Sequence, residues 1–290
     1  GAVAAAEAAG MCRERGRKKT LVSASLHPDS IETVTTYCFG ADEPVETLPL
    51  KNGAVDLTAL KAALDETVSG VLIQSPNFYG VIEDVSAIAE IVHAAGAKLV
   101  VSTNPIACAL IQTPGECGAD VAVGEGQPLG MPLSFGGPYL GFMACKKDMI
   151  RKLPGRIVGQ TSDAQGRRCF VLTLQAREQH IRREKASSNI CSNQALCALT
   201  AAAYCSAMGP EGISEVARQC YDKAHALAEG LNGVKGFELL NPKATFFHEF
   251  VTKTPVPAEQ LLSALAKKGI LGGLPVEGGI LWFATERTTK

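Results

Sequence analysis

Four short apolar runs with helix-like segments between them constrain the fold of this chain more than any other feature. The runs cover residues 71–74, 98–103, 119–123 and 140–144. An amphipathic segment at 85–95, ended by Gly96, separates the first two runs and has the period of a helix. Strands that are apolar throughout are typical of a parallel sheet covered on both faces. The sequence therefore predicts an α/β fold built on such a sheet.

The pattern changes after Arg168, where longer helix-like segments follow. A charged helix is expected over 175–185. A long Ala- and Leu-rich helix comes next, and Gly209-Pro210 should stop it. From Gly212 onward, helix-like and strand-like segments indicate a smaller α+β unit.

We therefore predict a large domain over residues 1–190, a bridging helix over 191–208 and a small C-terminal α+β domain over 209–290. The first residues already read as the body of an Ala-rich helix, and the chain ends shortly after an apolar stretch. For these reasons we expect a fragment that lacks its N-terminal region.

Composition argues against several classes of function. A net charge of -1 gives no basic excess for nucleic acid, and no apolar run approaches the roughly 20 residues that span a bilayer. The ten cysteines show no C-x-x-C spacing, so neither a zinc site nor a redox motif is indicated. So many thiols suit a reducing compartment. We expect a cytoplasmic protein with no metal, no nucleic-acid partner and no membrane anchor.

Residues 124–141 form the most unusual segment, with six glycines and three prolines between two expected strands. Glycine permits positive φ and close approach of the backbone, and proline excludes a helix. The first glycines are spaced G-x-G-x-x-x-G, and Pro128 and Pro132 prevent a helix from starting there, so this is not a dinucleotide-binding fingerprint. Two interpretations stay open: a ligand-binding loop, and a rigid connection that packs against a neighbouring subunit.

A second segment, residues 173–185, is dense in charged side chains, among them Arg177, His180, Arg182 and Arg183. Such a mixture of charges is usually a solvated helix face. The alternative is a subunit interface or an anion clamp, because arginine binds carboxylate and phosphate through paired hydrogen bonds.

Eight characteristic sequence segments follow one another along the chain, at residues 4–9, 74–80, 114–120, 123–130, 134–138, 153–156, 173–185 and 188–191. Together, and in this order, they resemble the glycine cleavage system P-protein family, specifically glycine dehydrogenase (decarboxylating) subunit 1 of its split form. The resemblance implies a fold type I pyridoxal-phosphate transferase-like large domain. It also implies an aminomethyl-transferring oxidoreductase of glycine catabolism. Such an enzyme decarboxylates glycine with pyridoxal phosphate and passes the aminomethyl group to the lipoyl arm of the H-protein.

The same resemblance implies what this chain lacks. In the lysine-bearing subunit of the family, the Schiff-base lysine stands five residues before a proline. Counting back from Pro132 places Gln127 there, and glutamine cannot form an imine. The aspartate that faces the cofactor's ring nitrogen is expected near Asn104, which carries no charge. We expect no catalytic residue on this chain, and we take Asn77, Asn104 and Gln127 as candidate cofactor contacts.

The leading hypothesis is therefore a non-lysine subunit, inactive alone, that pairs with a lysine-bearing subunit 2 in a heterotetramer and completes its pocket. The partner's lysine would hold pyridoxal phosphate, and the lipoyl H-protein and glycine would bind the assembly. Two alternatives stay open. One is an independent pyridoxal-phosphate enzyme that uses another lysine, such as Lys146 or Lys147. The other is a non-catalytic scaffold.

Overall fold

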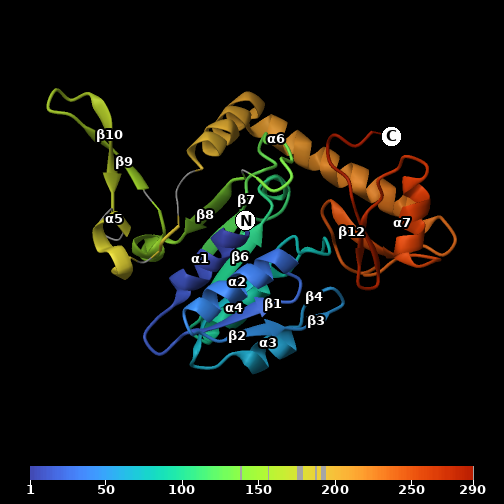
Figure 1. Ribbon diagram of the computed structural model, residues 1–290, viewed down its shortest axis with the longest axis horizontal. Coiled ribbons are helices and arrows are strands. Elements are labelled where there is room, and N and C mark those ends of the chain that lie inside the picture. The colour runs from blue at the N-terminus through green and yellow to red at the C-terminus, as the bar shows by residue number, and fades with distance from the viewer. Residues whose placement is uncertain (138, 156, 175–178, 187, 191–193, 290) are drawn as a thin grey trace.

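The computed structural model describes residues 1–137, 139–155, 157–174, 179–186, 188–190 and 194–289. A large sheet covered by helices, a long helix and a smaller C-terminal sheet follow one another along the chain (Figure 1). None of the described helices has the length and apolar character needed to cross a bilayer.

The central sheet has six strands in the order β2-β1-β5-β6-β7-β8. It is parallel except for β8, which pairs antiparallel with β7. The inner strands β1 and β5 are almost wholly buried, which for β5 confirms the interpretation of the apolar run at 71–74. The strands are β1 (Lys19–Ser23), β2 (Val45–Leu48), β5 (Val68–Gln74), β6 (Lys98–Thr103), β7 (Val121–Glu125) and β8 (Gly141–Cys145).

Helices cover both faces of this sheet because neighbouring side chains of a strand point to opposite sides. Val22 of β1 packs in the cluster with α1 and α2, and Leu21 packs in the cluster with α3 and α4. Asp56 and Asp84 cap α3 and α4 by accepting hydrogen bonds from backbone amides. The helices are α1 (Ala2–Cys12), α2 (Pro28–Gly40), α3 (Leu57–Ala63) and α4 (Val85–Ala94).

The long helix α6 (Ala195–Asn232) leads to the smaller sheet. The expected stop at Gly209-Pro210 is a kink instead, where Gly209 has φ 62° and ψ -178° and helix resumes at Pro210. Beyond the kink, Ala217 and Cys220 pack against Phe247 of the C-terminal part. The smaller sheet is antiparallel, in the order β11-β12-β14-β13. Its elements are β11 (Glu238–Leu239), β12 (Glu249–Lys253), α7 (Ala258–Ala266), β13 (Leu274–Val276) and β14 (Gly279–Phe283).

An antiparallel hairpin of β9 (Ile157–Ser162) and β10 (Arg168–Thr173) stands away from the central sheet (Figure 1). The expected helix over 175–185 is wrong in its described part. Only α5 (Gln179–Arg182) is α-helical there, and Arg183, with φ 52°, begins the 3-10 turn Arg183–Lys185. Residues 175–178 lie outside the described residues. The remaining short elements are β3 (Leu50–Lys51), β4 (Ala54–Val55) and the 3-10 helices Ala107–Ala109 and Lys147–Lys152.

Candidate functional site

A cavity of about 660 Å³ lies at the carboxyl ends of β5, β6 and β7, between the central sheet and the C-terminal sheet. Parallel α/β sheets bind their ligands at this edge. Its wall includes Gly1, Ala2, His27, Asp29, Ser30, Gln74, Pro76, Phe78, Ser102, Thr103, Asn104, Glu125, Gln127, Pro128, Tyr139, His248, Glu249, Leu274, Leu281 and Phe283. Both parts of the chain therefore contribute to one site.

Gln127 reaches the cavity from the glycine-rich loop that follows β7. Its Nε2 donates a hydrogen bond to the backbone oxygen of Met131 at 2.7 Å, so its Oε1 is the end available to the cavity. A Cβ on Gly124 would lie 2.3 Å from the Thr103 oxygen, and one on Gly130 would lie 2.9 Å from an α6 side chain. The glycines thus let the loop pack tightly against β6 and α6 while it lines the cavity.

Asn104 lines the same cavity and lies directly after β6. Its Oδ1 accepts a hydrogen bond from the Ile106 amide at 2.9 Å, and its Nδ2 is 3.4 Å from Nε2 of His248. Burial lowers the pKa of His248 to about 4, so the ring is neutral at pH 7. In the tautomer with the proton on Nδ1, Nε2 can accept from Asn104. Gln127 and Asn104, two of the candidate cofactor contacts, therefore both line the cavity, and His248, which was not predicted, joins them.

Glu249 is the second residue that sequence reasoning missed. It begins β12 and follows His248, and one of its carboxyl oxygens is 3.9 Å from His248 Nε2. Burial raises the pKa of Glu249 to about 7. The wall therefore holds a carboxyl group that changes charge near neutral pH. Nothing in the local sequence around residues 248–249 indicates this position.

Asn77, the third expected cofactor contact, does not line the cavity. It is fully buried beneath the wall, where its Nδ2 donates to the Gly53 oxygen and to Oε1 of Glu83, both at 2.8 Å. Its Oδ1 accepts from the amides of Tyr79 and Val81. All of its polar atoms are thus used within the chain, and it fixes the loop that carries Pro76 and Phe78 into the wall.

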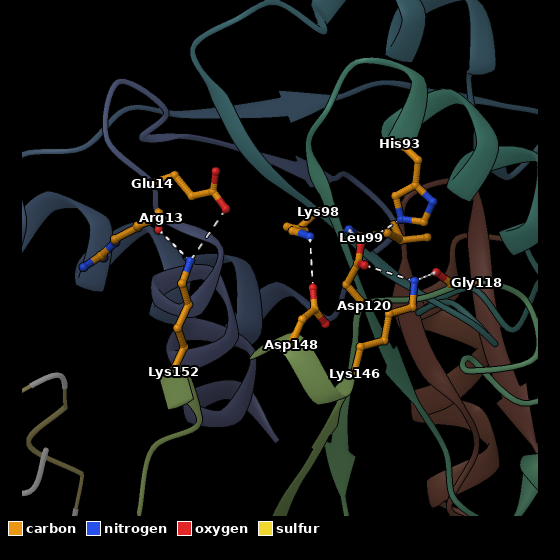
Figure 2. Close-up of polar contacts among 10 residues, drawn as sticks. All are labelled: Arg13, Glu14, His93, Lys98, Leu99, Gly118, Asp120, Lys146, Asp148 and Lys152. Carbon is orange, nitrogen blue, oxygen red and sulfur yellow. Dashed lines mark hydrogen bonds and ion pairs between the residues drawn. The ribbon is translucent and has the colours of Figure 1, made fainter. Parts of the chain in front are cut away.

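Lys146 and Lys147 lie at the opposite end of the central sheet, where β6 and β7 begin. Because β8 is antiparallel, its last residue Cys145 pairs with Val121, the first residue of β7. Figure 2 shows Lys146 directed at Asp120, with Nζ donating to Oδ1 at 3.1 Å. Neither lysine is in the cavity wall. In the described chain, the geometry therefore gives no support to either lysine as a substitute Schiff-base residue.

Asp120 is the centre of a charge cluster at that same end of the sheet. Its Oδ2 accepts hydrogen bonds from the Leu99 amide and from Nε2 of His93, both at 2.8 Å (Figure 2). Burial by itself raises the pKa of Asp120, but the bonds from Leu99, His93 and Lys146 outweigh it and hold the pKa below its usual value. The cluster ties α4, β6, β7 and the end of β8 together.

The charged segment lies apart from the cavity. His180, Arg182 and Arg183 are exposed, and none of them is in the cavity wall. Arg177 lies outside the described residues. The expectation that these side chains contact a partner or an anion stays a prediction.

Comparison with known proteins settles the family. The family model for the glycine cleavage system P-protein matches residues 1–289. This chain belongs to the P-protein family. It is 52% identical to the probable glycine dehydrogenase (decarboxylating) subunit 1 of Desulforamulus reducens, a match that covers 100% of this chain and 67% of that protein. The corresponding protein of Desulfitobacterium hafniense is 48% identical, with the same coverage.

Solved structures agree with this assignment. The crystal structure of a glycine decarboxylase (P-protein) of the glycine cleavage system, in inhibitor-bound form, matches with a TM-score of 0.94 and 44% identity. The match covers 100% of this chain and 67% of that one, so this chain spans about two thirds of such relatives. A sphingosine-1-phosphate lyase from Burkholderia pseudomallei, at TM-score 0.71 and 16% identity, shares the fold. The mixed α/β sheet is thus the fold type I arrangement expected from the sequence.

Pyridoxal phosphate, on which the P-protein family depends, does not fit the described wall of this cavity. An imine needs an amine, and Gln127 provides an amide already bound to Met131. A protonated ring nitrogen needs a carboxylate, and Asn104 provides none. Among the described wall residues there is also no lysine or arginine to bind a phosphate. At these positions the described wall thus supplies no amine, no carboxylate in place of Asn104, and no cationic side chain for a phosphate.

Proposed function

We propose that this chain is a large part of the non-lysine subunit of a two-subunit glycine dehydrogenase (decarboxylating). The supporting observation is Gln127, which occupies the cavity where an imine-forming amine would be needed and whose Nε2 is fixed on Met131. Relatives about half identical to the chain are named as subunit 1 of this enzyme. The activity therefore belongs to the assembled enzyme, and this chain alone is inactive.

The names of these relatives imply a second subunit. We propose that a lysine-bearing subunit 2 holds pyridoxal phosphate, that the two subunits form a heterotetramer, and that the lipoyl H-protein accepts the aminomethyl group derived from glycine. His180, Arg182 and Arg183, with Arg177, are the proposed contacts to the partner or to an anionic group on it. His180, Arg182 and Arg183 are exposed and lie outside the cavity wall, which suits a contact with a second chain better than a contact with a ligand inside the cavity.

The proposed division into parts is a large domain over 1–190, a bridging helix over 191–208 and a small domain over 209–290. The kink at Gly209 supports the second boundary, since the helix beyond it packs with Phe247 of the C-terminal part. On this division, the small domain contributes His248 and Glu249 to a cavity formed mainly by the large domain.

Reconstitution tests the proposed function. The chain, the lysine-bearing subunit and lipoylated H-protein are purified separately, and exchange of labelled bicarbonate into the carboxyl group of glycine is measured for each protein alone and for the mixture. We expect exchange only in the mixture. Borohydride reduction and peptide mapping should place the pyridoxyl-lysine on the partner. Exchange by this chain alone, a pyridoxyl-lysine on it, or a mixture that neither associates nor exchanges would overturn the proposal.

A further inference from the structure

Three amide side chains stand next to one another along the cavity wall. Gln74 ends β5, Asn104 follows β6 and Gln127 lies just after β7, and these strands are neighbours in the sheet. Adjacent strands are about 4.8 Å apart, so the row spans roughly 10 Å. This width is comparable to that of a substituted six-membered ring.

Each amide is fixed at one end by the backbone. Gln74 accepts from the His27 amide through Oε1 at 3.0 Å, and Asn104 accepts from the Ile106 amide through Oδ1 at 2.9 Å. Gln127 instead donates through Nε2 to the Met131 oxygen at 2.7 Å. These bonds determine which end of each amide is left for a ligand. The row therefore presents the amino group of Gln74, the oxygen of Gln127, and the one hydrogen of the Asn104 amino group that is not directed at His248.

The charges of the wall disfavour an anion. Its described residues include no lysine or arginine, but they include the carboxylates Asp29, Glu125 and Glu249. Oε1 of Glu125 is already used, since it accepts from the amides of Gln127 and Leu140. A phosphate or carboxylate on a ligand would meet no lysine or arginine among the described wall residues and would be repelled by the ionised carboxylates.

The rest of the wall suits a flat ring. The Phe78 ring lies edge-on to His27 with centroids 5.2 Å apart, and Leu274, Leu281 and Phe283 add apolar surface from the C-terminal sheet. Aromatic and aliphatic walls with a few fixed polar groups are typical of small-molecule sites.

We propose that the cavity of this chain binds a small, planar, uncharged heteroaromatic molecule that carries no phosphate. A ring nitrogen accepts a hydrogen bond from Nδ2 of Asn104, and an N–H or O–H substituent donates to Oε1 of Gln127. A pyridine carboxamide meets both requirements. The site does not depend on the proposed function, because it needs neither a partner subunit nor turnover.

Nicotinamide is the probe, and nicotinate, which has the same shape but carries a carboxylate, is its matched control. Saturation-transfer NMR titrations of the isolated chain near neutral pH measure the binding of both compounds. We expect nicotinamide to bind saturably with a Kd of about 1 mM and nicotinate at least about tenfold more weakly. Pyridoxine 5′-phosphate, added as a competitor, should not displace nicotinamide.

Two variants test the row of amides. Asn104→Asp keeps the bond from Ile106 but exchanges the donor for an acceptor, and Gln127→Leu removes the acceptor; each should weaken nicotinamide binding about tenfold. Gln165→Leu, at an exposed position in the turn of the β9–β10 hairpin, should change nothing. Melting temperatures establish whether the variants fold. If Gln127→Leu does not fold, the nearly isosteric Asn104→Asp alone tests the site. The proposal fails if binding does not saturate below about 20 mM, if nicotinate binds as well, or if folded site variants bind like the wild type.

Discussion

Replacing Asn77 by aspartate should destabilise the fold strongly, although the shape of the side chain hardly changes. Asn77 is fully buried and donates through Nδ2 to the Gly53 oxygen and to Glu83 Oε1, both at 2.8 Å. Asn77→Asp removes both donated bonds and brings a second carboxyl group against that of Glu83. Each buried acceptor left without a donor costs about 1–3 kcal/mol. We expect the free energy of unfolding to fall by about 4 kcal/mol where the new group is ionised.

The sign of the pH dependence follows from the neighbours of the new carboxyl group. Burial already raises the pKa of Glu83, and a second buried carboxyl beside it must also have a raised folded pKa. Below the unfolded pKa, near 3.9, both states are protonated and the new group can still donate one bond. As pH rises toward the folded pKa, the unfolded chain loses its proton first. Stability then falls by about 1.4 kcal/mol per pH unit for each proton, so the deficit is largest at alkaline pH.

Urea unfolding followed by circular dichroism at mildly acidic and mildly alkaline pH measures this effect. Asn52→Asp is the control, because it adds the same charge at an exposed turn position with φ 56° that aspartate tolerates. The control should stay within about 0.5 kcal/mol of the wild type. If Asn77→Asp unfolded like the wild type at both pH values, or became more stable as pH rises, the structural role assigned to Asn77 would be refuted.

Four further outcomes are expected. Gly80→Ala should cost more than about 2 kcal/mol in urea unfolding, because a Cβ there, at φ 86°, would overlap the backbone of β12. Gly166→Ala, at φ 74° in open space, should cost about 1 kcal/mol, and equal costs would contradict the close approach. Above its unfolded pKa, Asp120 contributes stability that is lost as pH falls through its depressed folded pKa. Asp120→Asn should therefore flatten the acid side of a profile of unfolding free energy against pH. An unchanged profile would count against the cluster. Burial raises the pKa of Cys12 to about 12, so iodoacetamide at pH 8 should label it only after unfolding, as peptide mass spectrometry would show; labelling of the native chain would contradict its burial. Gln127→Lys should gain no glycine decarboxylation by itself, because the ring would still lack a carboxylate, and release of labelled carbon dioxide from glycine by that variant would contradict this.

The central sheet was predictable because its inner strands, such as β5 and β6, are buried on both faces. The runs at β5 and β6 have no polar alternation, and the helix α4 between them shows a clear period and ends before Gly96. The direction of β8 was not predictable, since an apolar run looks the same in a parallel and an antiparallel strand. The charged segment after Thr173 has helical propensity, but Arg183 takes a positive φ that ends the helix early. Helix propensity therefore did not predict the end of this helix, because propensity does not describe a residue with positive φ.

The candidate site was half predictable. Gln127 and Asn104 could be placed together from the sequence, because both follow strands whose carboxyl ends meet at one edge of a parallel sheet. His248 and Glu249 could not, because they come from a separate antiparallel sheet whose docking leaves no local pattern. Asn77 was misplaced for a related reason. The sequence around Asn77 resembles a ligand-binding loop, and only the fold shows that the Asn77 side chain is hydrogen-bonded to Glu83.

The polar groups that face the cavity and those that shape it are separate sets in this chain. Gln127 and Asn104 face the cavity, and each is held by a bond to nearby backbone. Asn77 and Glu83 lie beneath the wall and bind loops from distant parts of the sequence. A substitution at the facing positions therefore leaves the hydrogen bonds beneath them intact. Under the proposed function, this separation lets the chain present a formed pocket wall to a lysine-bearing partner although Gln127 and Asn104 provide neither an amine nor a carboxylate.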